Sequence, residues 1–255
     1  MSYNKNGVIL SETSDVVVLA VGLKASSSNR KTGGMVQVYI LRRDMSPLDA
    51  VRAGADVSVC GDCQHRATWR VNRNGERVLR RRCYVDLGKG AAGVWACYHR
   101  GGYRRAEAHE LGDIFRGRTV RFGAYGDPYY MPWHLIPAIA AHAARWTGYT
   151  HQWRNVGATA LSGYLMASVD SEAEALEARR MGWRTFRVAP KGDSTRLERE
   201  ISCPASAEAG KRTTCDRCGL CNGRRGDDGR AHIVIQDHSV IAKTTPLIQI
   251  AAAVA

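Results

Sequence analysis

Eight cysteines are the residues of this chain most suited to chemistry, and all but Cys97 fall into two groups. A Cys-x-x-Cys pair turns two thiolates toward one metal ion or cluster. The first residues carry no secretory signal, so we expect a cytoplasmic, reducing compartment in which disulfides are rare. The sequence therefore predicts two metal centres. Their ligands would be Cys60, Cys63 and Cys83 in the first centre, and Cys203, Cys215, Cys218 and Cys221 in the second.

Each centre has alternatives for its last ligand. Cys97 lies in an apolar stretch and is either a core thiol or a fourth ligand of the first centre, a place that His65 could also take. In the second centre, His232 or His238 could replace Cys203 if that cysteine belongs to the core. A centre with only three protein ligands can bind a substrate or cofactor atom, whereas a saturated one is structural.

Polar residues follow a series of stretches that we interpret as strands. In parallel α/β proteins, ligands bind at the carboxyl ends of the strands. The sequence therefore predicts one site at a common rim, although each motif alone could be a turn or a helix cap, Asp170-Ser171 above all. The motifs are Gly126-Asp127, Thr150-His151-Gln152, Ser168 with Asp170-Ser171, Arg187, and Asp237-His238.

Strands and helices alternate with short links between residues 119 and 188, which indicates βαβ units and a parallel sheet. We expect an α/β fold in the form of a partial or closed parallel (β/α) barrel. Residues 1–55 would add a β-hairpin, with strands at 15–23 and 35–43, and a short helix packed on the barrel. Residues 56–200 would form the barrel core with the first cysteine group. Residues 201–255 would hold the second metal site, a last strand and a closing helix.

The net charge of +13 comes largely from arginine. Such a charge favours a nucleic acid or a nucleotide as partner, and the alternative is a basic surface that only contacts solvent. No apolar run approaches the roughly 18 residues that a membrane helix needs, so we expect no membrane partner.

The order of these motifs resembles the radical S-adenosylmethionine (SAM) superfamily. There a three-cysteine loop precedes a strand ending in Gly-Gly-Glu-Pro, and a later strand ends in a Ser-x-Asp element. Here the cysteines precede Gly126-Asp127-Pro128 and Ser168-Val-Asp170, and the likeness covers about residues 56–190. The chain also resembles bacteriophage proteins of the "gene product eighty-eight" kind over most of its length. That likeness rests on the early Cys-x-x-Cys and Cys-Tyr, the late cysteine cluster and a final Ile-x-x-His.

The first resemblance implies which cofactors the predicted site residues would bind. Cys60, Cys63 and Cys83 would hold a [4Fe–4S] cluster with one open iron, although nineteen residues separate Cys63 from Cys83 where the superfamily has two. Asp127, in place of the usual Glu, would meet the amino group of SAM. Gly126, Ser168, Asp170 and Arg187 would line the cofactor cleft. The catalytic residues would be Asp127, His151, Ser168 and Asp170. The second cysteine group would hold another [4Fe–4S] cluster or a zinc ion.

Three functions remain as hypotheses. The first is an iron–sulfur enzyme that modifies a nucleotide or nucleic acid and draws on an electron donor that the sequence does not name. The second is a zinc-stabilised protein that binds nucleic acid without catalysis. The third resembles the barrels of tRNA-guanine transglycosylases, whose late zinc site matches the position of the second cysteine group, although their catalytic motifs are absent from this chain.

Overall fold

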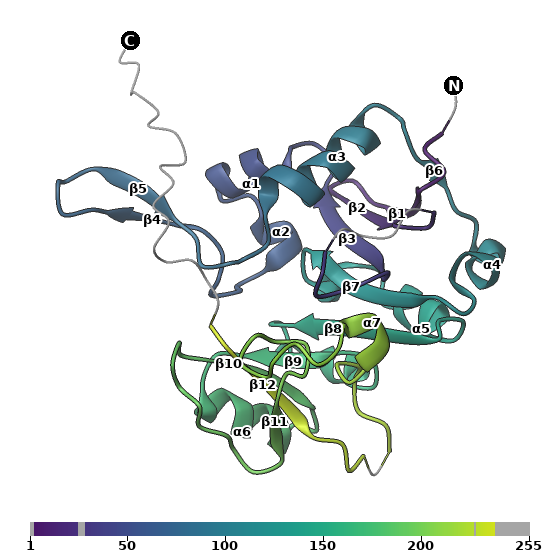
Figure 1. Cartoon of the computed structure of the whole chain (residues 1–255). Helices are drawn as coiled ribbons and strands as arrows, with labels where there is room; N and C mark the ends of the chain where they lie inside the picture. Colours follow the sequence, from purple (N-terminus) through teal and green to yellow (C-terminus); the bar gives the residue numbers. More distant parts are fainter. Residues whose placement is uncertain (1–2, 25–28, 227, 238–255) are drawn as a thin grey trace.

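A single ten-stranded sheet dominates the described part of the computed structural model, which comprises residues 3–24, 29–226 and 228–237 (Figure 1). The strand order is β11-β12-β10-β9-β8-β7-β3-β2-β1-β6. These strands are β1 (Gly7–Glu12), β2 (Val16–Val21), β3 (Val36–Arg42), β6 (Arg104–Arg105), β7 (Thr119–Tyr125), β8 (Arg145–Thr150), β9 (Met166–Val169), β10 (Thr185–Ala189), β11 (Glu200–Ser202) and β12 (His232–Gln236). A separate hairpin consists of β4 (Thr68–Val71) and β5 (Arg77–Arg80).

From β3 across to β11, every neighbouring pair of strands is parallel. β7, β8, β9 and β10 are also neighbours in chain order, as successive βαβ units require. The predicted α/β fold with a mostly parallel sheet is therefore confirmed, whereas its barrel form stays a prediction. The parallel direction brings the carboxyl ends of these strands to one edge, where the candidate site lies.

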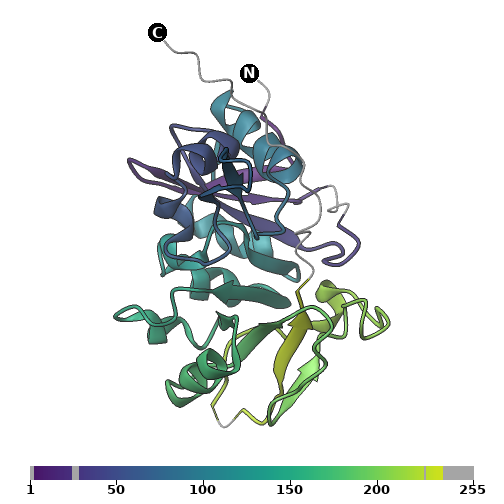
Figure 2. The ribbon, with the colours of Figure 1, turned by 90° about the vertical axis from the view of Figure 1, so that its left-hand side faces the viewer.

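The N-terminal strands continue this sheet. The predicted hairpin at 15–23 and 35–43 is confirmed as the antiparallel pair β2–β3, and β3 then pairs with β7 in parallel. Three strands were not predicted: β6 and β11, which are short and form the two edges of the sheet, and β1, which lies between β2 and β6. The N-terminal and C-terminal strands occupy opposite ends of the molecule (Figure 2).

Short helices flank the sheet, and capping residues explain several of their ends. Ser46 accepts a hydrogen bond from the Asp49 amide at the start of α1, and Gly54 ends that helix with φ +71°. Ser171 likewise caps α6 by accepting from the Glu174 amide, as predicted. The α-helices are α1 (Pro47–Ala53), α2 (Val57–Cys60), α3 (Ala92–His99), α4 (Leu111–Phe115), α5 (Leu135–Ala140), α6 (Glu172–Arg180) and α7 (Cys215–Cys218).

Apolar residues recur at helical spacing between Met131 and Trp146, which predicts one helix over 131–146, and this prediction is largely wrong. Only α5 is α-helical there, and β8 begins at Arg145. Pro132 delays the start, because proline strongly favours a turn or a first helical turn. The closing helix expected at 246–255 lies outside the described residues. No helix in the described ranges is long and apolar enough to cross a membrane.

Candidate functional site

A cavity of about 130 Å³ lies at the carboxyl ends of β7, β8 and β9. It brings the first cysteine group together with four of the residues expected at one rim, and these side chains come from five separate segments of the chain. Its lining includes Cys60, Cys63, His65, Cys83, Gly126, Asp127, His151 and Ser168.

Two turns bring the three cysteines to this cavity. Cys60 ends α2, and the next residue, Gly61, has φ +60°; a Cβ there would lie 2.4 Å from the Tyr130 hydroxyl. Glycine is therefore required for the tight turn to Cys63. Cys83 returns after the β4–β5 hairpin, and its backbone N–H donates to the carbonyl of His65 at 2.9 Å. The hairpin thus closes the gap in sequence that separates Cys83 from the Cys-x-x-Cys pair.

The buried thiols of this group resist ionisation. Burial raises the pKa of Cys60 well above its usual value and the pKa of Cys63 to about 12. The charges of the neighbouring thiols and of Asp127 act in the same direction. Thiolates are the ligand form of cysteine, so the group needs a cation to be ionised at neutral pH.

Asp127 connects three elements around the cavity and is only 7% exposed. Its carboxylate accepts hydrogen bonds from the amides of Tyr129, at 3.0 Å, and His151, at 2.8 Å. Its own amide donates to Val59 in α2 at 2.7 Å. Burial raises its pKa to about 6, against the opposing effect of these hydrogen bonds. Asp127 therefore both forms the predicted turn and presents a carboxyl group that titrates near neutral pH to the cavity.

A second set of ligand groups adjoins the cysteines. One Asp170 oxygen lies 2.7 Å from His65 Nε2, and the other lies 3.8 Å from His151 Nε2. Burial alone would raise the pKa of Asp170, but the hydrogen bond and charge of His65 outweigh it and lower the pKa. Burial also lowers the pKa of His151, which favours its neutral imidazole. The sequence predicts His65 only as a possible ligand beside the cysteines, and its contact with Asp170 was not predicted.

Ser168 lies at the cavity as expected, whereas Arg187 and Cys97 do not. Ser168 lines the cavity, and its carbonyl accepts from the Trp153 indole at 3.1 Å. Arg187 does not line it: its guanidinium, which is 1% exposed, pairs with Glu200 at 2.7 Å. Adjacent side chains of a strand face opposite ways, so the Arg187 side chain lies on the face of β10 that is turned away from the cavity. Cys97 also lies elsewhere, within reach of the Asn4 side-chain amide at 3.7 Å.

The second cysteine group gathers beside β8 and β12. Cys203 and Cys221 belong to a buried cluster with Met166, Phe186 and Ile233. Cys215 and Cys218 are the two ends of α7, and the Cys215 amide donates to the carbonyl of Lys31 at 2.9 Å.

The four thiols of this second group lie close enough to influence one another. Burial raises the pKa of Cys221 to about 12, and the charges of the other three thiols add to this effect. The other three thiols thus lie within electrostatic reach of Cys221, but no three sulfur atoms of either cysteine group lie within 4.8 Å of one another among the described residues.

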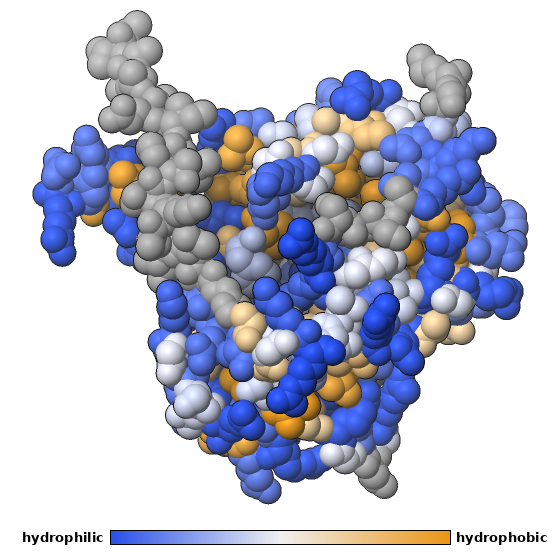
Figure 3. Space-filling model, viewed as in Figure 1, coloured by the Kyte–Doolittle hydropathy of each residue, from blue (hydrophilic) through white to orange (hydrophobic). Residues whose placement is uncertain are grey.

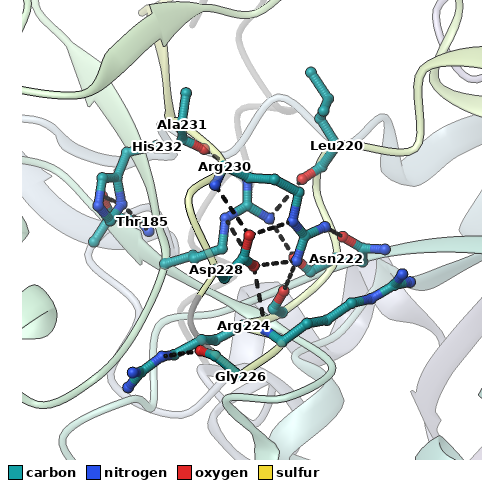
Figure 4. Close-up of polar contacts among 12 residues, drawn as sticks. Thr185, Leu220, Asn222, Arg224, Gly226, Asp228, Arg230, Ala231 and His232 are labelled. Carbon is teal, nitrogen blue, oxygen red and sulfur yellow. Dashed lines mark hydrogen bonds and ion pairs between the residues drawn. The ribbon is translucent and has the colours of Figure 1, made fainter.

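Arg184 fixes the backbone on both sides of Cys221. Its guanidinium donates to the carbonyls of Leu220, at 2.8 Å, and Asn222, at 2.6 Å. The ion pair between Asp228 and Arg230 lies beside these contacts and holds the loop that follows Cys221 (Figure 4).

The alternative histidine ligands of the second centre can be placed only in part. His232 is occupied elsewhere, because its Nδ1 accepts from the Thr185 amide at 3.0 Å in the sheet. His238 lies outside the described residues.

The comparisons with known proteins identify no relative of this chain. No family model matches it, and neither a curated protein nor a solved structure does.

Proposed function

We propose that this protein is an iron–sulfur enzyme of radical-SAM-like type, with its cluster held by Cys60, Cys63 and Cys83. The observation that carries the proposal is the convergence of these cysteines with Asp127 and Ser168 in one cavity. That cavity lies where ligands bind in parallel α/β proteins. The run of parallel strands β7 to β10 supports a partial (β/α) barrel as the scaffold.

The donor set fits such a cluster. Three cysteines line the cavity, and no fourth cysteine does among the described residues, so one iron would remain open to a substrate or cofactor. The raised pKa values of Cys60 and Cys63 also fit, because a bound cationic centre is what would keep these thiols ionised. When bound, the cluster would supply one-electron chemistry, with SAM as the candidate cofactor at the open iron.

The residues around the cluster site would position that cofactor. Asp127 can accept or hold a proton because its pKa of about 6 is close to neutral pH. Gly126 lets the chain turn there with φ +79°, which places Asp127 at the cavity. Ser168 presents its hydroxyl-bearing side chain to the same cavity, which otherwise contains much apolar surface.

The metal content of the purified protein tests this proposal. Protein purified without oxygen should be brown and contain iron and acid-labile sulfide. Adding SAM should change the electron paramagnetic resonance (EPR) spectrum of the reduced cluster. Cys83→Ala should lose the first cluster, whereas the control Cys97→Ala should keep it, because Cys97 lies outside the cavity. A colourless protein that contains zinc alone would refute the iron–sulfur function.

A second candidate is a zinc protein that binds nucleic acid, and the β4–β5 hairpin favours it. This hairpin projects from the body of the protein (Figure 1), and its surface is mainly hydrophilic (Figure 3). It carries Arg70, Arg73, Arg77 and Arg80, with the Arg77 guanidinium 5.1 Å from the ring centre of Trp69. Trp69 is 45% exposed, and an exposed aromatic ring among arginines is suited to stacking on unpaired bases.

Both candidates share this partner, so we propose nucleic acid or a nucleotide as the ligand of the hairpin. Replacing Arg70, Arg73 and Arg77 with Gln should weaken the binding of single-stranded oligonucleotides and flatten its salt dependence. Arg196, Arg199 and Arg212 provide a matched control on another surface. Equal losses in the two triple variants would refute the role of the hairpin.

A further inference from the structure

We propose that His65, His151 and Asp170 bind one divalent transition-metal ion, at a site distinct from both cysteine groups. The chemistry of the donors, two imidazoles and one carboxylate, suits Fe²⁺, Mn²⁺, Co²⁺ or Zn²⁺. None of the three ligands is a cysteine, so the proposal does not depend on the iron–sulfur function.

The geometry is close to that of a coordinated ion. One ligand atom from each of the three residues lies within 4.8 Å of the other two, and this is the one such group of His, Cys, Asp and Glu in the part of the chain described. Bonds of about 2.1 Å to nitrogen and oxygen would hold the ligand atoms roughly 3 Å apart. His65 Nε2 and Asp170 are already separated by 2.7 Å. The 3.8 Å between His151 Nε2 and Asp170 requires an approach of only about 1 Å.

An unpaired nitrogen atom supplies an independent indication of a ligand. His151 Nε2 is inaccessible to solvent and makes no hydrogen bond within the described structure, although it faces the Asp170 carboxylate. A buried polar atom without a partner destabilises a protein. A metal ion between the three side chains would satisfy His151 Nε2, which the protein itself leaves without a partner.

The backbone around each ligand is fixed by hydrogen bonds that do not involve the other two. The His65 carbonyl accepts from Cys83, and the His151 amide donates to Asp127. The Asp170 amide donates to the Glu174 carboxylate at 2.8 Å, where the helix α6 begins. Such supporting contacts orient the ligands before an ion arrives.

The number of ligands determines what the ion could do. Three protein ligands leave coordination positions for water or a substrate oxygen, which is the arrangement of catalytic rather than structural sites. His65 and His151 themselves line the cavity with Cys63 and Asp127, so an ion here would lie at the wall of that cavity. It could therefore act as a Lewis acid toward an oxygen of the molecule bound in that cavity.

Mn²⁺ is the suitable probe, because it prefers nitrogen and oxygen ligands and leaves thiolates to softer metals. The full chain, freed of loosely bound metal, should bind one equivalent of Mn²⁺, measured as loss of the EPR signal of the free ion. His151→Gln and Asp170→Asn should each weaken binding at least about tenfold. His134→Gln, at an exposed histidine, should bind as the unaltered protein does.

Two further measurements keep the proposal falsifiable if a variant folds poorly. Pulsed EPR of Mn²⁺ on the unaltered chain should show coupling to imidazole nitrogen, and its absence would overturn the site. Cys83→Ala should still bind the ion, and loss of binding there would place the ion at the cysteines instead. If the purified protein never contains iron, yet Cys83→Ala still binds Mn²⁺, then the iron–sulfur function has failed while this site stands.

Discussion

The raised pKa of Asp127 predicts that this carboxyl group makes the stability of the protein depend on pH. A pKa that rises from 3.8 in the unfolded chain to about 6 in the folded protein corresponds to about 3 kcal/mol. The folded state then binds more protons than the unfolded state between these pH values. The free energy of unfolding contributed by Asp127 is therefore greatest below pH 3.8 and falls as pH rises toward 6.

The substitution Asp127→Asn isolates this effect, because asparagine does not titrate. Asn can still accept one of the two amide hydrogen bonds, from Tyr129 or His151, but its NH₂ group must then face the other donor. The variant should therefore be less stable at low pH by about 1–3 kcal/mol. The difference in unfolding free energy between the two proteins should shift by about 3 kcal/mol in favour of the variant by pH 7. Only the unaltered protein carries the carboxyl group whose stabilising contribution is lost as pH rises.

Urea unfolding of metal-free protein between pH 4 and pH 7, under reducing conditions, measures this difference. The thiols do not interfere, since burial keeps the pKa values of Cys60 and Cys63 above this range. The histidines titrate in both proteins, so their contribution cancels in the difference to a first approximation. A difference in unfolding free energy that stays constant across the range would refute the assignment of a raised pKa to Asp127.

Three further substitutions test the elements that position the two sites. Gly126→Ala should destabilise the protein by more than about 2 kcal/mol in thermal unfolding, because its Cβ would lie 2.5 Å from the Ile40 carbonyl at φ +79°. Gly75→Ala, with φ +80° and no neighbour within 4 Å, should show only the smaller backbone strain; equal losses would disprove the steric argument. Glu200→Gln should destabilise by about 3–5 kcal/mol, because Arg187 would be left buried without its charge partner, and a loss below 1 kcal/mol would contradict this. Arg184→Met should lower the content of any metal that the second cysteine group holds, measured beside Arg199→Met as control, and unchanged content would show that Cys221 is held by other contacts.

The sequence carried enough information to predict much of the site. The spacing of Cys60 and Cys63 is a local property, and so is the turn that Gly126 allows before Asp127. Ser171 as the cap of α6 is local as well, since its partner is the amide of Glu174. Contacts within a few residues are fixed by chain geometry, so short motifs predict them directly.

Contacts between residues that are far apart in the sequence could not be predicted from such local motifs. His65 and Asp170 are 105 positions apart, and only the order of the strands brings them to 2.7 Å. Arg187 fits the pattern of polar residues at strand ends, yet its side chain pairs with Glu200 and does not line the cavity. Which face of a strand a residue occupies depends on register, and register depends on neighbours that the local sequence does not contain.

The sequence by itself thus determined the types of side chain in the site and the mostly parallel α/β framework, because thiol spacing and strand–helix alternation are encoded in consecutive residues. The tertiary structure decided which of these groups share a cavity. It added the contact of His65 and His151 with Asp170 and removed Arg187 from the rim. The physical reason is that proximity across a sheet is set by strand order and burial, which are properties of the whole fold.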